Sequence, residues 1–347
     1  MRHPFPEYTS ADDVAIRPDG PQTRPRFGVE GMRRLRAAAA VDRWLTIVAV
    51  AMVVTALVTA IAIVIDPHHI TGEREWIKPT RFAVSIAIYC FTILWLLRFV
   101  KGHRWLVALT ARAIGISLVV EEVIIAAQVL RGTTSHFNFS SILNETLFLI
   151  MGSFIVVVWI MTLVVAIVLL RQRIADAVVA LSVRLGLAIS LVGSALGAVM
   201  VIPNVAQRRA LEVGAHLSVV GAHTVGARDG GPGLPVVGWS TVGGDLRVAH
   251  LVGLHALQVL PLLGWALSRA RLRTYLDTAE RVALLWVSGI AYLAVVATLE
   301  WQALRGESFI HPGALTLSCL ALILGTAGAS VGVVIVPKRR ESSAASS

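Results

Sequence analysis

The stretch WLTIVAVAMVVTALVTAIAIVI at Trp44–Ile65 decides the class of this protein, because it holds no charged residue and is long enough to cross a membrane. A helix needs about 20 apolar residues to span roughly 30 Å of hydrocarbon. Since an open sheet cannot satisfy its backbone hydrogen bonds in lipid, such runs are expected to be helices. The eight predicted spans are Trp44–Ile65, Phe82–Val100, Leu106–Leu130, Leu147–Leu170, Leu185–Ile202, Val248–Leu267, Val282–Leu304 and Gly313–Val336.

The composition places the whole chain in the membrane class. Of its 347 residues, 56% are hydrophobic and only 15% are charged, whereas a soluble domain carries roughly 25% charged residues. The net charge of +10 is explained by basic membrane loops, so the expected partner is the lipid bilayer and no nucleic acid. Cys90 and Cys319 fall inside apolar runs, which excludes a disulfide framework and a cysteine metal motif.

The predicted fold is all-α: a polytopic transmembrane helix bundle of about eight spans. Residues 1–43 are expected to form a disordered basic tail, residues 44–336 the transmembrane domain, and residues 337–347 a second tail, with disorder after Arg340. Basic residues are more numerous in the tails and in the loops on their side, for example at Arg269, Arg271 and Arg273, so both termini are expected to be cytoplasmic. The expected location is the plasma membrane.

The longest connection, residues 203–247, is expected to face outward. Its DGGPGLP run at residues 229–235 is typical of turns, and Trp239 indicates that the loop packs on the outer face of the bundle. A structureless loop of this length is uncommon in a compact protein. We therefore expect a structured extracytoplasmic loop between the fifth and sixth spans.

Polar residues interrupt the spans mainly on the side expected to face outward. An ionisable group in hydrocarbon costs about 2.5–3.5 kcal/mol, so a one-sided cluster of such groups indicates a site. At about 100° per residue, the polar residues of the sixth span fall within an arc of roughly 140°, which must face protein or water. They are Arg247, His250, His255 and Gln258.

The third span carries a second polar face. Ser117, Glu121 and Gln128 follow i+4 and i+7 spacing, whereas Glu122 points about 100° away. Glu121 lies at a depth similar to that of His255. A buried carboxyl group without a partner stays neutral, but beside a protonated histidine it can ionise.

These patterns give two sets of candidate residues. Some members also have a packing interpretation: Gln128, Gln258 and Glu300 as contacts between helices, and His250 as an interfacial group. The pair His68-His69 is expected to be a solvated turn rather than a metal site. The ligand- or proton-handling candidates are Glu121, Gln128, Asp245, Arg247, His255, Gln258 and Glu300. The metal-ligating candidates are His136, His223, His250 and His255.

Small residues recur in the fifth and eighth spans, at Gly193 and Gly197 and at Gly325, Gly328 and Gly332. In lipid, small residues let helix backbones approach closely. We expect both stripes to serve packing within the chain, with a homo-oligomer seam as the alternative.

Three stretches together resemble an uncharacterised family of bacterial polytopic membrane proteins. They are WIKPTRF at residues 76–82, RGTTSHFN at 131–138, and the segment from His223 to Pro261 with its GLHALQ run at 253–258. The resemblance covers about residues 66–335 and implies a multi-span fold, but no activity and no residue role. The chain holds no Gly-x-Ser-x-Gly elbow, no His-Glu-x-x-His pair and no phosphate-binding glycine loop.

Three functions compete. In the first, an outward cavity lined by the third, sixth and seventh spans binds or transports a small polar or ionic ligand, while Glu121 and His255 exchange protons. In the second, outward histidines hold heme or a transition metal, since imidazole suits iron, copper and zinc. In the third, the polar residues only pin the loops to the bundle, with ion pairs formed by Lys78, Arg81, Asp245 and Arg247. The sequence favours the first and leaves enzyme activity open.

Overall fold

The computed structural model describes residues 27–344. The chain divides into a short N-terminal unit that ends at Ala37 and a second unit, from Ala38 onward, that holds the apolar helices. Helix α1 (Phe27–Val41) lies within the segment predicted to be the N-terminal tail. A helix forms here because four consecutive alanines favour it and Glu30 pairs with Arg33 and Arg34 at 3.0 Å. The rest of that predicted tail, residues 1–26, lies outside the described residues.

Eight of the described helices are long and apolar enough to cross a membrane, which confirms the predicted all-helical bundle. This makes the chain compatible with a multi-pass membrane protein, while the orientation of the termini and the identity of the membrane stay predictions. The eight helices are α2 (Arg43–Ile65), α3 (Ile77–Leu97), α4 (Arg104–Leu130), α5 (Ile142–Arg171), α6 (Ala177–Leu196), α8 (Leu246–Leu267), α10 (Thr278–Leu304) and α11 (Ala314–Ala344).

Several helices extend beyond their apolar runs, because their ends are set by caps and not by hydropathy. Helix α5 begins five residues before Leu147, where the Ser141 hydroxyl accepts the Asn144 backbone N–H. Helix α6 continues into a 3-10 turn, η1 (Gly197–Val201). Helix α11 runs to Ala344 and so extends into the segment predicted to be the C-terminal tail.

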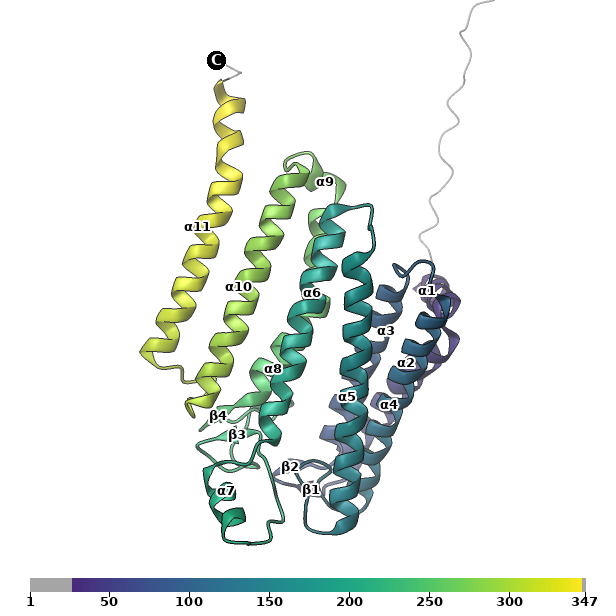
Figure 1. Cartoon of the computed structure of the whole chain (residues 1–347), viewed down its shortest axis with the longest axis vertical. Helices are drawn as coiled ribbons and strands as arrows, with labels where there is room; N and C mark the ends of the chain where they lie inside the picture. Colours follow the sequence, from purple (N-terminus) through teal and green to yellow (C-terminus); the bar gives the residue numbers. More distant parts are fainter. Residues whose placement is uncertain (1–26, 345–347) are drawn as a thin grey trace, which may run out of the picture. The chain divides into compact units, whose positions relative to one another are not determined.

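The helices pack in sequence-adjacent and more distant pairs. Helix α2 packs along α3, α4 along α5, α6 along α8, and α10 along both α8 and α11 (Figure 1). The largest apolar cluster is shared by α2 to α6 and reaches α8 at Leu257, and its fully buried side chains include Leu45, Ile93, Ile114, Leu169 and Leu187. The central packing is therefore apolar, and polar side chains need separate contacts.

One end of the bundle carries the longer loops, and we call it the loop end. It holds the hairpin of β1 (His69–Ile70) and β2 (Glu73–Arg74), helix α7 (Val205–Glu212), and the pair β3 (Thr224–Val225) and β4 (Gly244–Asp245) (Figure 1). The short α9 (Ala270–Arg273) lies at the other end. Trp239 packs edge-on against Phe309, with ring centroids 5.5 Å apart. The 203–247 segment therefore packs against the connection between α10 and α11 at this end.

Gly193 of α6 and Gly197, the first residue of η1, pack within the chain. A Cβ atom at Gly193 would lie 2.3 Å from the backbone of Gly253 on α8, and one at Gly197 would lie 2.8 Å from the His250 ring. At these two glycines the chain packs against α8, which agrees with the packing interpretation, and a homo-oligomer seam stays an untested prediction. A Cβ atom at Gly325, Gly328 or Gly332 of α11 would meet no other part of the described chain within 4 Å, so a seam there stays a prediction.

Candidate functional site

An amine, an imidazole and a carboxyl group meet at the loop end, and we call them the polar triad. The Nζ atom of Lys78, in the first turn of α3, lies 3.1 Å from Nδ1 of His136. Nε2 of His136 lies 3.7 Å from Oε1 of Glu121 on α4. Glu121 and His136 were separate candidates in the sequence, one for protons and one for metal. Lys78 was expected only to pin a loop.

The loop that carries His136 is held by a dense set of hydrogen bonds. Gln128, at the end of α4, donates to Asn144 Oδ1 on α5 at 3.1 Å and to the Thr134 carbonyl at 3.3 Å. Asn138 donates to the same carbonyl at 2.9 Å. The interpretation of Gln128 as a contact between helices is therefore supported, and its contacts fix the loop that presents His136.

Aromatic side chains surround the imidazole of His136. The rings of Phe82, Phe137 and Phe148 have centroids 5.6–6.1 Å from it. His223 lies behind Phe137, with ring centroids 4.9 Å apart. These rings leave the His136 side chain 21% exposed. An imidazole enclosed in this way forms few hydrogen bonds with water.

The environment keeps His136 neutral. Burial, then the nearby Lys78 ammonium group, then His223 hold the pKa of His136 well below its usual value. The neutral ring accepts from Lys78 at Nδ1, which places the remaining proton on Nε2, facing Glu121. The contact with Glu121 is therefore a polar contact of a neutral imidazole and not an ion pair.

Several buried oxygen atoms near the triad have no hydrogen-bond partner among the described residues. They include Oε2 of Glu121, both carboxyl oxygens of Glu122 and the hydroxyl of Ser117. The side chains of Ser117, Glu121 and Gln128 are at most 2% exposed, as expected for residues on one buried helix face. Buried polar groups are normally paired. A proton, an ion or a polar ligand that reached these oxygens would supply the hydrogen-bond or ionic partner that they lack.

Asp245 and Arg247 are satisfied by each other and by the loop. Oδ2 of Asp245 lies 2.6 Å from Nη2 of Arg247 and accepts the Ser240 backbone N–H at 2.7 Å. Arg81 pairs with Glu73 and donates to the carbonyl of Val237. These contacts fit the structural interpretation of Asp245, Arg247 and Arg81 better than a role in ligand binding.

His255 does not contact Glu121. Its ring is exposed, and Nδ1 lies 3.3 Å from Oε1 of Gln258 on the same helix. Gln258 in turn donates to the Thr92 hydroxyl on α3 at 3.0 Å. Glu121 and His255 therefore make no direct contact through which the predicted proton exchange could occur. The histidine that contacts Glu121 is His136.

The remaining candidates lie in separate surroundings. His250 contacts the Gly193 carbonyl at 2.8 Å, and His223 contacts Asp229 at 3.0 Å. Among the described residues, the four candidate histidines do not form a group of three metal-ligating side chains. Glu300, 7% exposed on α10, has both carboxyl oxygens unpaired within the described part of the chain.

A shallow depression lies between α8 and α10 at the loop end, and it leaves no room for even one enclosed water molecule. Its lining includes Asp245, Val248, Leu299 and Gln302, and no residue of α4 contributes to it. It is therefore not the cavity expected between the third, sixth and seventh spans. The polar triad lies outside its lining.

Acidification should destabilise this end of the protein through His136. An unfolded histidine titrates near pH 6.5, whereas the folded pKa of His136 is held well below its usual value by burial, Lys78 and His223. Below about pH 6.5 the unfolded chain takes up the proton first, so the free energy of unfolding falls by up to about 1.4 kcal/mol per pH unit. Thermal unfolding in detergent from pH 7.5 to 5.5 should show a shallower slope for His136→Gln. The exposed His216→Gln is the control, and equal slopes for His136→Gln and the unmodified protein would contradict the prediction.

No protein-family model matches this chain, and neither the comparison with curated proteins nor that with solved structures finds a similar protein.

Proposed function

We propose that this membrane protein binds or transports a small polar or ionic ligand, and that Lys78, His136 and Glu121 handle the proton coupled to that step. One observation carries the proposal. Oε1 of Glu121 contacts His136, while Oε2 has no partner among the described residues although the side chain is 2% exposed. This carboxyl group can accept a proton or a cation without first losing a hydrogen bond.

The polar triad supports this role because it connects an amine to a carboxyl group through an imidazole. If Nδ1 of His136 takes a proton from Lys78 while Nε2 gives its proton to Glu121, the imidazole changes tautomer and stays neutral. The ammonium and carboxylate then become an amine and a carboxylic acid. The net charge of the triad is unchanged, but Lys78 and Glu121 both change from charged to neutral.

A bound ion would bias that equilibrium. A cation near Glu121 favours the charged form of the triad, as does an anion near Lys78, because each stabilises the opposite charge. Glu122, the next residue, is 3% exposed and adds a second carboxyl group without a partner among the described side chains. Intramembrane carboxyl and histidine chains are typical of proton-coupled proteins, which is why we prefer this function to a purely structural one.

Replacing Glu121 by glutamine should remove a titrating carboxyl group from the protein. Infrared difference spectra of the purified protein, recorded while the pH is stepped, resolve the carbonyl stretch of protonated carboxyl groups. We expect the Glu121→Gln spectrum to lack the band of one carboxylic acid, because the amide keeps the shape of the side chain but cannot take up the proton.

Glu212→Gln is the matched control, since Glu212 is exposed on α7 and undergoes the same chemical change. Its spectrum should match that of the unmodified protein in the buried-carboxyl region. His136→Gln should shift the pH at which the Glu121 band changes. If Glu121→Gln folds and leaves the titrating bands intact, Glu121 does not exchange protons and the proposal fails.

Proton movement is tested in liposomes loaded with a pH-sensitive dye. An imposed pH difference, with the membrane potential clamped by potassium and valinomycin, should give proton entry that Glu121→Gln abolishes and Glu212→Gln leaves unchanged. Equal entry in all three proteins would exclude the polar triad as a proton path.

A further inference from the structure

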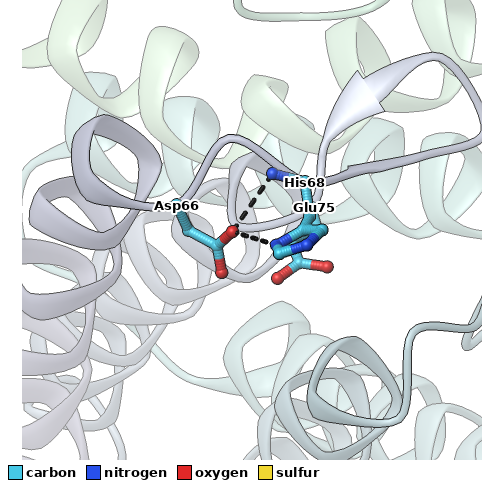
Figure 2. A group of neighbouring side chains, drawn as sticks. All are labelled: Asp66, His68 and Glu75. Atoms are coloured by element: carbon cyan, nitrogen blue, oxygen red, sulfur yellow. Dashed lines mark hydrogen bonds and ion pairs between the residues drawn. The ribbon is translucent and has the colours of Figure 1, made fainter.

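A second group of polar side chains lies on the hairpin between α2 and α3. Asp66, His68 and Glu75 each offer one ligand atom, and these three atoms lie within 4.8 Å of one another. Figure 2 shows the Asp66 carboxylate facing the His68 ring, with the Glu75 carboxylate beside that ring. The group shares no residue with the polar triad.

The hairpin holds two of these side chains opposite each other. β1 and β2 pair antiparallel with His69 opposite Arg74, and the Glu75 backbone N–H donates to the His68 carbonyl at 3.2 Å. The connecting residues Thr71 and Gly72 both have positive φ, +49° and +81°, as a two-residue type I′ turn requires. The turn therefore fixes the register that places His68 beside Glu75.

Further contacts fix the hairpin and the third side chain. The indole N–H of Trp76 donates to Oδ2 of Asp66 at 3.0 Å, which orients that carboxylate. A Cβ atom at Gly72 would lie 2.5 Å from the Gly230 carbonyl oxygen, so the turn is seated against the 203–247 segment. Metal-binding carboxylates usually have such a hydrogen-bonded partner behind them.

We propose that Asp66, His68 and Glu75 bind a divalent transition-metal ion of the zinc type. Imidazole nitrogen with carboxylate oxygen is a donor set that zinc accepts, at about 2.0–2.2 Å from each atom. Tetrahedral ligands at that distance lie roughly 3.3 Å apart. The three ligand atoms lie within 4.8 Å of one another, and Nδ1 of His68 is 2.6 Å from Oδ1 of Asp66, so small side-chain rotations bring them to that spacing.

The site is open to solvent. The side chain of His68 is 79% exposed and that of Asp66 is 28% exposed, so an ion can enter without unfolding the hairpin. Three protein ligands leave a fourth position for water or for a group on another molecule. The sequence predicts that His68 and His69 form a solvated turn. In the structure His69 is outside the ligand group, and the partners of His68 are the two carboxylates.

The test measures Zn²⁺ binding to the full-length protein in detergent after chelation and buffer exchange. Calorimetry should give one Zn²⁺ per chain, and elemental analysis of the desalted complex should agree. His68→Ala should weaken binding at least about 100-fold, because losing even a partner behind a ligand costs 10–100-fold. His69→Ala is the matched control, as it removes the neighbouring exposed histidine and should bind as the unmodified protein does.

Three further measurements complete the test. Trp76→Phe, which keeps an aromatic ring but removes the donor to Asp66, should weaken Zn²⁺ binding about 10-fold or more. Co²⁺ should replace Zn²⁺ and give visible absorption that His68→Ala and Glu75→Gln both lose. Size-exclusion profiles and melting temperatures verify that each variant is folded.

Zn²⁺ binding that is equal in folded His68→Ala and unmodified protein would overturn the proposal, as would an equal loss in His69→Ala. Failure of the unmodified protein to bind Zn²⁺ would overturn it as well. If His68→Ala does not fold, the decision passes to Glu75→Gln, and full Co²⁺ absorption in that variant counts against the site. None of these outcomes bears on proton uptake by Glu121.

Discussion

Replacing Asp245 by alanine should lower the free energy of unfolding by about 3–5 kcal/mol, the cost of breaking one side of a buried ion pair. The Asp245 side chain is 0% exposed, and its carboxylate accepts hydrogen bonds from Nε and Nη2 of Arg247, at 2.9 and 2.6 Å. It also accepts the backbone N–H groups of Ser240 and Arg247, at 2.7 and 3.0 Å. Alanine leaves the Arg247 charge and both donors without these acceptors.

The expected loss is measured by unfolding the detergent-purified protein in mixed micelles with increasing SDS. Asp176→Ala is the matched control, because Asp176 also caps a helix, α6, and pairs with an arginine, Arg273 at 2.9 Å. Its side chain is 32% exposed and that of Arg273 is 51% exposed, so we expect a loss of only about 1–2 kcal/mol. A loss for Asp245→Ala no larger than that of the control would show that the buried pair does not fasten the loop end.

Replacing Gly193 by alanine should cost about 3 kcal/mol or more, at the upper end of the range for overpacking. The added Cβ would lie 2.3 Å from the carbonyl carbon and 2.5 Å from Cα of Gly253. Both atoms belong to the backbone of α8, so no side-chain rotation can make room. Moving the helices apart would also break the 2.8 Å contact between His250 and the Gly193 carbonyl.

Gly152→Ala is the control for this substitution. Gly152 lies inside α5, another apolar helix, and a Cβ there meets no atom within 4 Å. Since alanine is favoured over glycine within helices by about 1 kcal/mol, Gly152→Ala should be neutral or slightly stabilising. The same SDS titration compares the two variants, and similar stabilities would mean that α6 and α8 do not cross at Gly193 and Gly253.

The apolar pattern alone identifies the helices, because a membrane span must satisfy its backbone within itself. The run from Trp44 to Ile65 illustrates this, since α2 covers it almost residue for residue. Helix periodicity also places Ser117, Glu121 and Gln128 on one face, and all three are buried. The boundaries are less predictable where a cap sets them, as Ser141 does for α5.

The loops hold most of what the sequence does not show. Lys78 and His136 are 58 residues apart in the chain, and periodicity relates residues only within one helix. The sequence predicts His255 as the partner of Glu121 because both lie at similar depth, but depth does not say which way a side chain faces. In the structure His255 is exposed and contacts Gln258.

The sequence by itself determined the all-helical class, the eight helices long and apolar enough to cross a membrane, and the buried polar face of α4, since these depend on hydropathy and on 3.6-residue periodicity. Only the tertiary structure decided that Lys78 and His136 meet Glu121, that Gly193 faces Gly253, and that Asp66, His68 and Glu75 gather on one hairpin. Those contacts depend on the paths of loops and the rotation of helices about their axes. Both are fixed by packing between distant segments, which no local pattern records.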